Sequence, residues 1–362
     1  MKKILLVFLA TALLALAPAA FGGELPRLSV SYIFTTHQEP FMVALARGEA
    51  FADSGVYLKP VVAKEKYDLM VKGNAVARLS VIVAKSGAET STLFAQKHLD
   101  IGLGSLPAMM TAIDKGLPIK VLCPVHTEGM GLVVAPANPV SDWNSFLSWV
   151  KGAKQPVKVG YHSPTSAPRI VIEGALREAG LAVTEDPGDS KAHVLLVDLK
   201  ETSNLIMALT SGQVDAWVGP DPIPAVAAEK KVGKIVMDLK DLPPAGRWSN
   251  FPCCVAAART EILAAHPAET AALVDLLTKS AAWITANRGE AAAITAEWLG
   301  MPREAVERST IVFGTDPTEG WIRGAGTYLD VLNAMNKLSG SLKGKKIEDA
   351  QEILFDFSHV RK

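Results

Sequence analysis

Hydroxyl, imidazole and amide side chains gather where predicted strands run into predicted helices. Thr36, His37 and Gln38 follow the first apolar run, and Pro40 stands where a helix would begin. Such groups bind a small polar ligand through hydrogen bonds. Capping by Thr36 accounts for one hydroxyl but not for the whole polar run, so we predict that all three residues contact a ligand.

Two further polar groups precede helices in the same way. Lys85, Ser86 and Gly87 stand before a helix predicted over 88–96, and Ser105 precedes the next predicted helix. The free N–H groups and the dipole of a helix start favour an anion. Lys85 either adds a full charge to this site or lies in solvent, as most lysines do. Ser105 as an N-cap would stabilise its helix by about 1 kcal/mol, a role compatible with ligand contact.

The richest donor cluster of the chain lies in one loop before a helix predicted over 167–179. It comprises His162, Ser163, Thr165, Ser166 and Arg169. One helix cap needs one hydroxyl and this loop carries three, so ligand contact is the better interpretation. Asp221 precedes a later predicted helix, where capping is the favoured role and a place in the ligand site is the alternative.

The familiar catalytic patterns are missing from the sequence. It holds no Gly-x-Ser-x-Gly elbow, no His-Glu-x-x-His zinc helix and no Walker-type phosphate loop. A triad assembled in space would leave no such pattern, yet no residue calls for one. We therefore expect a binding protein that is not an enzyme and has no cofactor or metal.

The three cysteines leave two interpretations open. Cys123 closes one apolar run, and Cys253 and Cys254 open another. If those two strands are neighbours, Cys123 can form a disulfide with one of the pair; buried free thiols are the equal alternative. A metal site needs more ligands than two adjacent thiols.

Short β-like runs alternate with helical patterns from Leu28 onward, which predicts an α/β fold. We expect strands over 28–34, 56–63, 78–84, 100–103, 119–123, 131–135, 157–161, 193–199, 215–218 and 234–239. Besides the helices already mentioned, we expect others over 41–52, 107–115, 205–211, 222–231, 262–287, 289–299, 319–338 and 347–354. Trp217 falls in strand-like surroundings and is expected in the core.

Length and composition set the class of protein. The 362 residues, 49% of them hydrophobic, suit a globular chain of two lobes. Equal numbers of basic and acidic residues, 37 each, argue against a nucleic-acid partner. Lys2, Lys3 and the apolar run over 4–16 predict a signal peptide over 1–22, with no nearby cysteine to carry a lipid. The mature protein is therefore expected to be exported.

Three stretches in register resemble one family. They are the opening helix with its exit, Glu39 to Leu58; the run from Lys85 to Pro107; and the run from Gly160 to Val218. Together they resemble the periplasmic substrate-binding proteins of ABC importers for nitrate, sulfonates, taurine and thiamine-pyrimidine precursors. The segment 62–77 is longer than the family pattern and looks like an inserted hairpin.

The resemblance implies a two-lobed type II periplasmic-binding-protein architecture. Each lobe would be a mixed sheet flanked by helices, and two crossover strands would join lobe 1 (23–126 plus 251–362) to lobe 2 (127–250). A ligand would lie in the cleft, which closes by a hinge. His126 and Trp248 would flank the cleft on the two crossovers, where Trp248 can stack on a ligand.

Ligand charge follows from the same placement. Three helix starts, after Gly87, Ser105 and Ser166, would point into one cleft, and Lys85 and Arg169 would add to their field. A small organic anion is therefore expected, such as a sulfonate, nitrate or a carboxylate. A neutral pyrimidine is the next choice, because aromatic rings can sandwich it.

The resemblance implies an exported periplasmic receptor that delivers its solute to ABC permease subunits in the inner membrane and works as a monomer. An alternative is a thiamine-pyrimidine role. The segment from Phe251 to Val255 resembles fungal thiamine-pyrimidine synthases, which carry a longer Cys-rich motif thought to hold iron and a lysine that carries pyridoxal phosphate. Only two of those cysteine positions are filled in this chain. A ligand sensor for a membrane kinase would use the same pocket.

Overall fold

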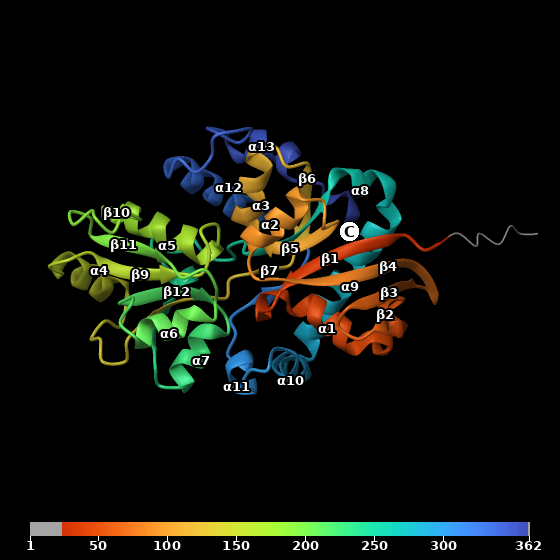
Figure 1. Cartoon of the computed structure of the whole chain (residues 1–362), viewed down its shortest axis with the longest axis horizontal. Helices are drawn as coiled ribbons and strands as arrows, with labels where there is room; N and C mark the ends of the chain where they lie inside the picture. Colours follow the sequence, from red (N-terminus) through yellow and green to blue (C-terminus); the bar gives the residue numbers. More distant parts are fainter. Residues whose placement is uncertain (1–23, 361–362) are drawn as a thin grey trace, which may run out of the picture.

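Two sheets organise the computed structural model, which describes residues 24–360 (Figure 1). The strands of the first sheet are β1 (Arg27–Ile33), β2 (Val56–Val62), β3 (Lys66–Val71), β4 (Asn74–Ala84), β5 (Ile101–Ser105), β6 (Ile119–Pro124) and β14 (Cys254–Arg259). They lie in the order β2-β3-β4-β1-β5-β14-β6. The late strand β14 runs antiparallel between β5 and β6, so the chain returns to its first lobe after building the second.

The second sheet has six strands. They are β8 (Met130–Val134), β9 (Val157–Tyr161), β10 (Val183–Thr184), β11 (Val194–Asp198), β12 (Ala216–Pro220) and β13 (Lys234–Asp238). Their order is β10-β11-β9-β12-β8-β13, with β8 antiparallel to both of its neighbours. A short antiparallel pair of β7 (His126–Thr127) and β15 (Val312–Phe313) lies where the chain leaves the first sheet for the second.

Helices cover both sheets, as expected for α/β lobes (Figure 1). They are α1 (Glu39–Arg47), α2 (Gly87–Ala95), α3 (Leu106–Asp114), α4 (Trp143–Gly152), α5 (Ala167–Glu178), α6 (Asn204–Thr210), α7 (Ile223–Glu229), α8 (Thr260–Ala265), α9 (Pro267–Ala286), α10 (Arg288–Leu299), α11 (Arg303–Glu307), α12 (Glu319–Ala334) and α13 (Ile347–Leu354). Short 3₁₀ helices are η1 (Thr36–Gln38), η2 (Gly48–Ser54), η3 (Leu239–Asp241) and η4 (Phe357–His359).

Two predicted helices end earlier than expected. Helix α1 stops at Arg47 because Gly48 takes a φ of 49°, and the chain continues as a 3₁₀ helix. The helix expected over 262–287 is broken at His266, which has the non-helical angles φ −133° and ψ 51°. The residue before a proline is disfavoured in the α conformation, so Pro267 starts a separate helix.

Helix α4 was not predicted. It begins with a capping box in which the Asp142 carboxylate accepts from the Ser145 N–H at 2.8 Å. It buries Trp143, Phe146 and Val150, which recur at helical spacing. The segment 62–77 contains β3, which pairs antiparallel with β2 and β4, as expected for an inserted hairpin.

The strand directions explain where polar loops meet. Strand β1 pairs parallel with β4 and β5, and β9 pairs parallel with β12. Parallel strands end at the same edge of a sheet, so the loops after these strands gather between the two lobes. Those loops are the ones whose polar residues the sequence singled out.

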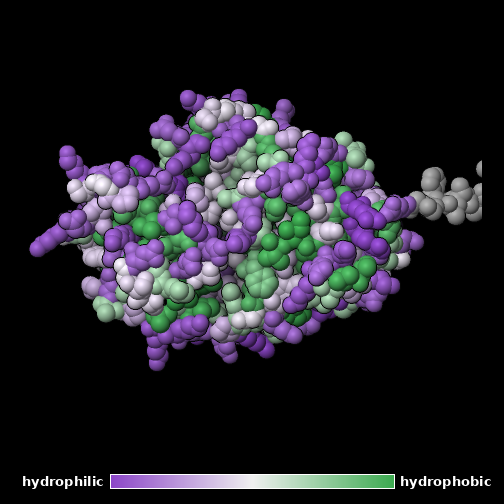
Figure 2. Space-filling view, viewed as in Figure 1, coloured by the Kyte–Doolittle hydropathy of each residue, from purple (hydrophilic) through white to green (hydrophobic). Residues whose placement is uncertain are grey.

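Apolar side chains form the interior of each lobe, and Trp217 is fully buried there as predicted. Polar side chains cover much of the face in Figure 2, with apolar side chains in smaller patches between them. Across residues 24–360 the helices are too short or too polar to cross a membrane. The predicted signal peptide lies outside the described residues.

Candidate functional site

A small cavity lies where the polar loops of the two lobes meet. Its volume is about 30 Å³, room for one or two water molecules. Of the residues predicted to bind a ligand, six line it: His37, Gln38, Gly87, Ser105, His162 and Ser166. Cys253 and Cys254, which were not predicted as ligand contacts, form part of the same wall.

Hydrogen bonds across the cleft hold the lobes together around this cavity. The Thr36 hydroxyl donates to the Asp221 carbonyl oxygen over 2.7 Å, and the Ser105 hydroxyl donates to the Thr165 carbonyl oxygen over 3.0 Å. Each bond joins a loop of the first lobe to a loop of the second. The structure therefore shows the cleft closed.

Three helix N-termini, those of α2, α3 and α5, begin at the cavity. Ser86 is an ordinary cap, because its hydroxyl accepts from the Glu89 N–H at 3.3 Å. Ser105 and Ser166 occupy cap positions without making a side-chain cap bond, so the capping role expected for Ser105 is wrong. The Ser166 hydroxyl donates to the Ser163 carbonyl oxygen at 2.8 Å and so tightens its own loop.

Gly87 lets the start of α2 approach β5 and α3. A Cβ at this position would lie 2.9 Å from the Ala108 Cβ and 2.9 Å from the Ser105 Oγ. Contacts that short do not occur between relaxed atoms, so only glycine fits without a shift of backbone. The cavity wall depends on this close approach.

Several polar atoms at the site are buried without a partner. The Gln38 amide makes no hydrogen bond through either its nitrogen or its oxygen, and the Nδ1 of His162 has no partner either. The hydroxyls of Ser163 and Thr165 are buried and unpartnered as well. An unsatisfied buried polar group costs about 1–3 kcal/mol, so a bound molecule that pairs with these groups would be stabilised.

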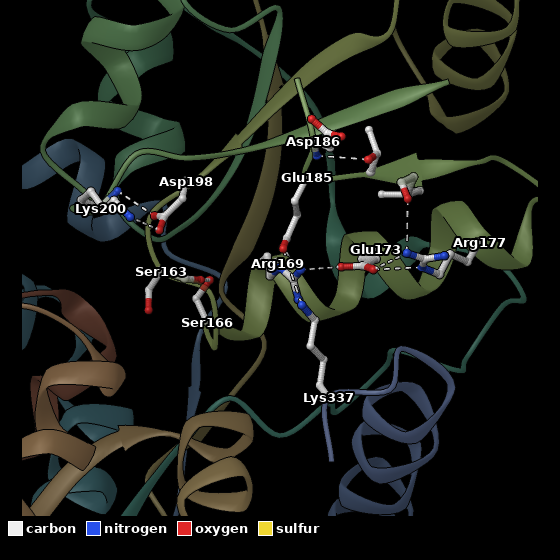
Figure 3. A network of polar contacts seen from close by, with 12 residues as sticks. Ser163, Ser166, Arg169, Glu173, Arg177, Glu185, Asp186, Asp198, Lys200 and Lys337 are labelled. Atoms are coloured by element: carbon white, nitrogen blue, oxygen red, sulfur yellow. Dashed lines mark hydrogen bonds and ion pairs between the residues drawn. The ribbon is translucent and has the colours of Figure 1, made fainter. Parts of the chain in front are cut away.

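The two cationic side chains expected at the site form ion pairs outside the cavity. Arg169 is buried and forms ion pairs with Glu185 and, at 2.8 Å, with Glu173 (Figure 3). Lys85 is exposed and pairs with Glu201 of the other lobe at 3.1 Å. Of the two interpretations of Lys85, the one that places it in solvent is therefore correct. The prediction that Arg169 and Lys85 add positive charge to the cavity is therefore wrong.

The imidazoles do not replace those charges. Burial lowers the pKa of His162 to about 4 and the pKa of His126 to about 4. Burial also lowers the pKa of His37, and the neighbouring His126 adds to the effect. All three rings are neutral at pH 7. Among residues 24–360, no lysine, arginine, aspartate or glutamate lines the cavity, so its polarity comes from neutral groups and helix ends.

Asp221 and Trp248 lie near the cleft in other roles. The Asp221 carboxylate accepts from the Thr310 N–H at 2.9 Å and from the Ser309 hydroxyl at 3.1 Å, and it makes no cap bond to α7. Capping by Asp221 is therefore wrong; the side chain joins the second lobe to the C-terminal half. Trp248 is buried against Phe251, with ring centroids 4.7 Å apart, and does not line the cavity.

Two histidines and two cysteines meet at one wall of the cavity. One ligand atom each from His37, His126, Cys253 and Cys254 lies within 4.8 Å of the other three. His37 Nδ1 is 3.3 Å from the Cys253 Sγ, although the two residues are 216 positions apart. Sequence spacing therefore could not reveal this group; its only signal was the adjacent Cys253-Cys254 pair.

The disulfide considered from the sequence is not formed. All three cysteines are free and buried. Cys123 pairs with Ala256 in the register of β6 and β14, two residues beyond Cys254, so it does not face either partner. Burial raises the pKa of Cys123 to about 12, as expected for an inert thiol in the core.

Comparison with known proteins gives a family and a fold. A model described as the NMT1-like family matches residues 22–300. The uncharacterized protein MJ1180 of Methanocaldococcus jannaschii is 34% identical over 143 residues, which are 37% of this chain and 97% of that protein.

Solved structures of similar fold include binding proteins of ABC-type import systems. The ligand-binding component of an import system from Staphylococcus aureus, solved with zinc bound, has a TM-score of 0.69 at 14% identity and covers 92% of this chain and 97% of its own. The alkanesulfonate-binding protein SsuA of Xanthomonas axonopodis has a TM-score of 0.63 at 12% identity, and the match covers 88% of this chain and 96% of SsuA. The nitrate-binding protein NrtA of Synechocystis has a TM-score of 0.63 at 14% identity, and the match covers 91% of this chain and 88% of NrtA. The two-lobed periplasmic-binding-protein fold is thereby confirmed.

Proposed function

The chain belongs to the NMT1-like family, and from that premise we propose that it is an exported solute-binding protein, which captures a small polar molecule between its lobes and delivers it to an ABC permease. The structural neighbours are binding components of import systems, which favours a receptor over an enzyme. Export is supported by the apolar N-terminal run and by the periplasmic relatives.

One observation carries the proposal: unpartnered polar groups from both lobes face one cavity. Gln38 comes from the first lobe and His162 from the second, and both line the cavity. A solute that accepts from the Gln38 amide and bonds to the His162 ring satisfies both lobes only when they are closed. Binding and closure are then coupled, as a transport receptor requires.

A small anion, such as a sulfonate, nitrate or a carboxylate, remains the ligand class that we propose. Three helix N-termini support it, each with roughly half a positive charge. No full positive charge assists them, so a neutral pyrimidine that accepts hydrogen bonds is the second candidate. Because the cavity measures about 30 Å³, a larger solute would leave the lobes partly open.

A thermal-shift panel of sulfonates, nitrate, carboxylates and pyrimidines tests this function. A solute present at 100 times its Kd would stabilise the protein by about 2.7 kcal/mol and raise the Tm. Small-angle scattering of the same samples would show whether that solute favours the closed form. If no member of the panel raised the Tm, the solute-receptor function would be lost.

A further inference from the structure

The wall that carries both cysteines has the composition of a metal site. His37, His126, Cys253 and Cys254 are between 0% and 4% exposed. They come from η1, from β7 and from the start of β14, three segments that the fold brings together between the lobes. The group of four contains two thiols and two imidazoles, which are soft to borderline donors that suit zinc and disfavour calcium or magnesium.

One nitrogen of each imidazole lies against a backbone carbonyl oxygen; the other nitrogen of His37 contacts only the two thiols, and the other nitrogen of His126 has no partner. The Nε2 of His37 lies 2.8 Å from the Gly129 carbonyl oxygen, to which it donates in the tautomer protonated there. The Nδ1 of His37 then keeps its lone pair, and it lies 3.3 Å from the Cys253 Sγ and 3.9 Å from the Cys254 Sγ. A ligand imidazole is usually oriented by such a bond from its other nitrogen to a carbonyl group.

His126 shows the same division between its two ring nitrogens. Its Nδ1 lies 3.2 Å from the Thr127 carbonyl oxygen, whereas its Nε2 is buried without any partner. A buried lone pair without a partner is costly, and a metal ion would satisfy it. This unpartnered nitrogen is a second observation, independent of the two thiols, that points to a ligand.

The spacing fits a tetrahedral ion after a small contraction. Zinc bonds of about 2.3 Å to sulfur and about 2.0 Å to nitrogen place neighbouring ligand atoms about 3.3–3.8 Å apart. The four ligand atoms lie within 4.8 Å of one another, so the longest separation would shorten by about 1 Å. We propose that His37, His126, Cys253 and Cys254 together bind one zinc ion in a tetrahedral site.

Zinc binds thiolates, so both Cys253 and Cys254 would give up their protons when the ion enters. Metal binding then releases protons and involves no oxidation or reduction.

The inference rests on the proposed function in one respect, because the ion would form the floor of the proposed solute cavity. Both cysteines and His37 line that cavity, and His162 faces it from the other lobe. The ion would join the first lobe to the crossover that contains His126. With two thiolate ligands and two neutral imidazoles the centre has no net charge, so the helix ends remain the source of positive potential at the cavity.

Cobalt substitution tests the site. The full-length mature protein is treated with a chelator and a reductant, dialysed, and titrated with Co²⁺ in an absorption spectrometer. We expect saturation at one equivalent, with thiolate-to-cobalt charge-transfer absorption in the near ultraviolet and the visible bands of tetrahedral cobalt. Added Zn²⁺ should abolish both. A wild-type protein without the charge-transfer band would overturn the proposal, and this outcome needs no variant.

Matched serine variants assign the ligands. Cys253→Ser with Cys254→Ser should lose the charge-transfer band, whereas Cys123→Ser, which changes a buried free thiol outside the cluster, should keep it with full intensity. A band that persisted in the double variant, or that vanished with Cys123→Ser in a folded protein, would overturn the assignment. Far-ultraviolet circular dichroism confirms that each variant is folded.

The two proposals fail separately. If cobalt binds and no solute raises the Tm, the solute-receptor function fails and the metal site stands. If a solute raises the Tm of metal-free protein and cobalt gives no thiolate band, only the metal site fails. Displacement of cobalt by Cu⁺ but not by Zn²⁺ would overturn the zinc assignment.

Discussion

Single residues make the cavity polar without making it charged. Imidazole, amide, hydroxyl and thiol groups line it, while Arg169 is held by Glu173 and Glu185 away from it (Figure 3). A buried guanidinium needs such partners, because an unpaired buried charge is strongly destabilising. The neutral groups that line the cavity are therefore available to bind a solute, whereas Arg169 is not.

Gln38→Leu should raise the stability of the protein and lower its affinity for the solute. The amide is buried without a partner, so replacing it with an apolar group of similar size should raise the free energy of unfolding by about 1 kcal/mol or more. The affinity for the solute found by thermal shift should fall about ten-fold or more, since the ligand loses its hydrogen bonds. Urea unfolding and calorimetric titration measure the two effects.

Gln96→Leu is the control for that change. Gln96 is exposed and does not line the cavity, so this variant should alter neither quantity appreciably. An unchanged solute affinity in Gln38→Leu would show that the amide does not contact the solute.

Glu39→Gln should stabilise the protein increasingly as pH rises above about 4.5. Burial raises the pKa of Glu39 from 4.5 to about 7, so the native state binds the proton more tightly than the unfolded chain. Wild-type stability therefore falls as pH rises from about 4.5 to about 7, relative to a variant that cannot ionise. Above this range the difference should reach about 3 kcal/mol, and below pH 4.5 it should disappear.

Urea unfolding at pH 4 and at pH 8.5 compares wild type with this variant. The control is Glu49→Gln, which changes an exposed glutamate and should have little effect at either pH. A stability difference for Glu39→Gln that did not depend on pH would contradict the burial argument.

At the scale of elements, one carboxylate holds the loop that follows α12 against the first lobe. Asp114 ends α3 and is 2% exposed. Its oxygens accept from the N–H groups of Ser339 at 2.8 Å, Gly340 at 3.0 Å and Leu342 at 2.8 Å. The loop after α12 depends on these bonds for its place.

Asp114→Ala should therefore lower the free energy of unfolding by about 3 kcal/mol, because the buried N–H of Leu342 and the half-buried N–H groups of Ser339 and Gly340 lose their acceptor. Chemical denaturation measures the loss. Asp114→Asn keeps one acceptor oxygen and should lie between wild type and alanine. Asp142→Ala removes an exposed helix cap and should cost only about 1 kcal/mol. Equal losses in Asp114→Ala and Asp142→Ala would contradict this role of Asp114.

At the scale of the whole molecule, closure depends on a few bonds between the lobes. Ser105 donates across the cleft to Thr165, whereas Ser166, also at a helix start beside the cavity, donates within its own loop. The two serines thus form a matched pair for testing closure without a solute.

Ser105→Ala should shift the solute-free protein toward the open form by about 0.5–1.5 kcal/mol, the usual net value of one hydrogen bond. The radius of gyration from small-angle scattering should increase. Ser166→Ala should leave that radius unchanged, because its bond does not cross the cleft. An increase of the same size in both variants would show that the Ser105 bond does not control closure.

The sequence by itself determined the α/β alternation, most strands and helices, the family resemblance and the loops that meet at the cleft. These follow from local patterns: apolar runs, helix starts, and the rule that parallel strands end at one edge. His37, Gln38, Ser105, His162 and Ser166 were found in this way, because each follows a strand.

Only the tertiary structure decided which polar groups are free and which are paired. Arg169 pairs with Glu185 and so adds no charge to the cavity, and the Asp221 carboxylate accepts from the Thr310 N–H and so caps no helix. Neither partner could be predicted, because it lies far along the chain or follows no periodic pattern. Cys123 and Cys254 lie on neighbouring strands, yet the register separates them by two residues and prevents a disulfide. The contact between His37 and Cys253 could not be predicted either. Contacts between distant segments depend on the order of strands in the sheet and on burial, and local sequence spacing encodes neither.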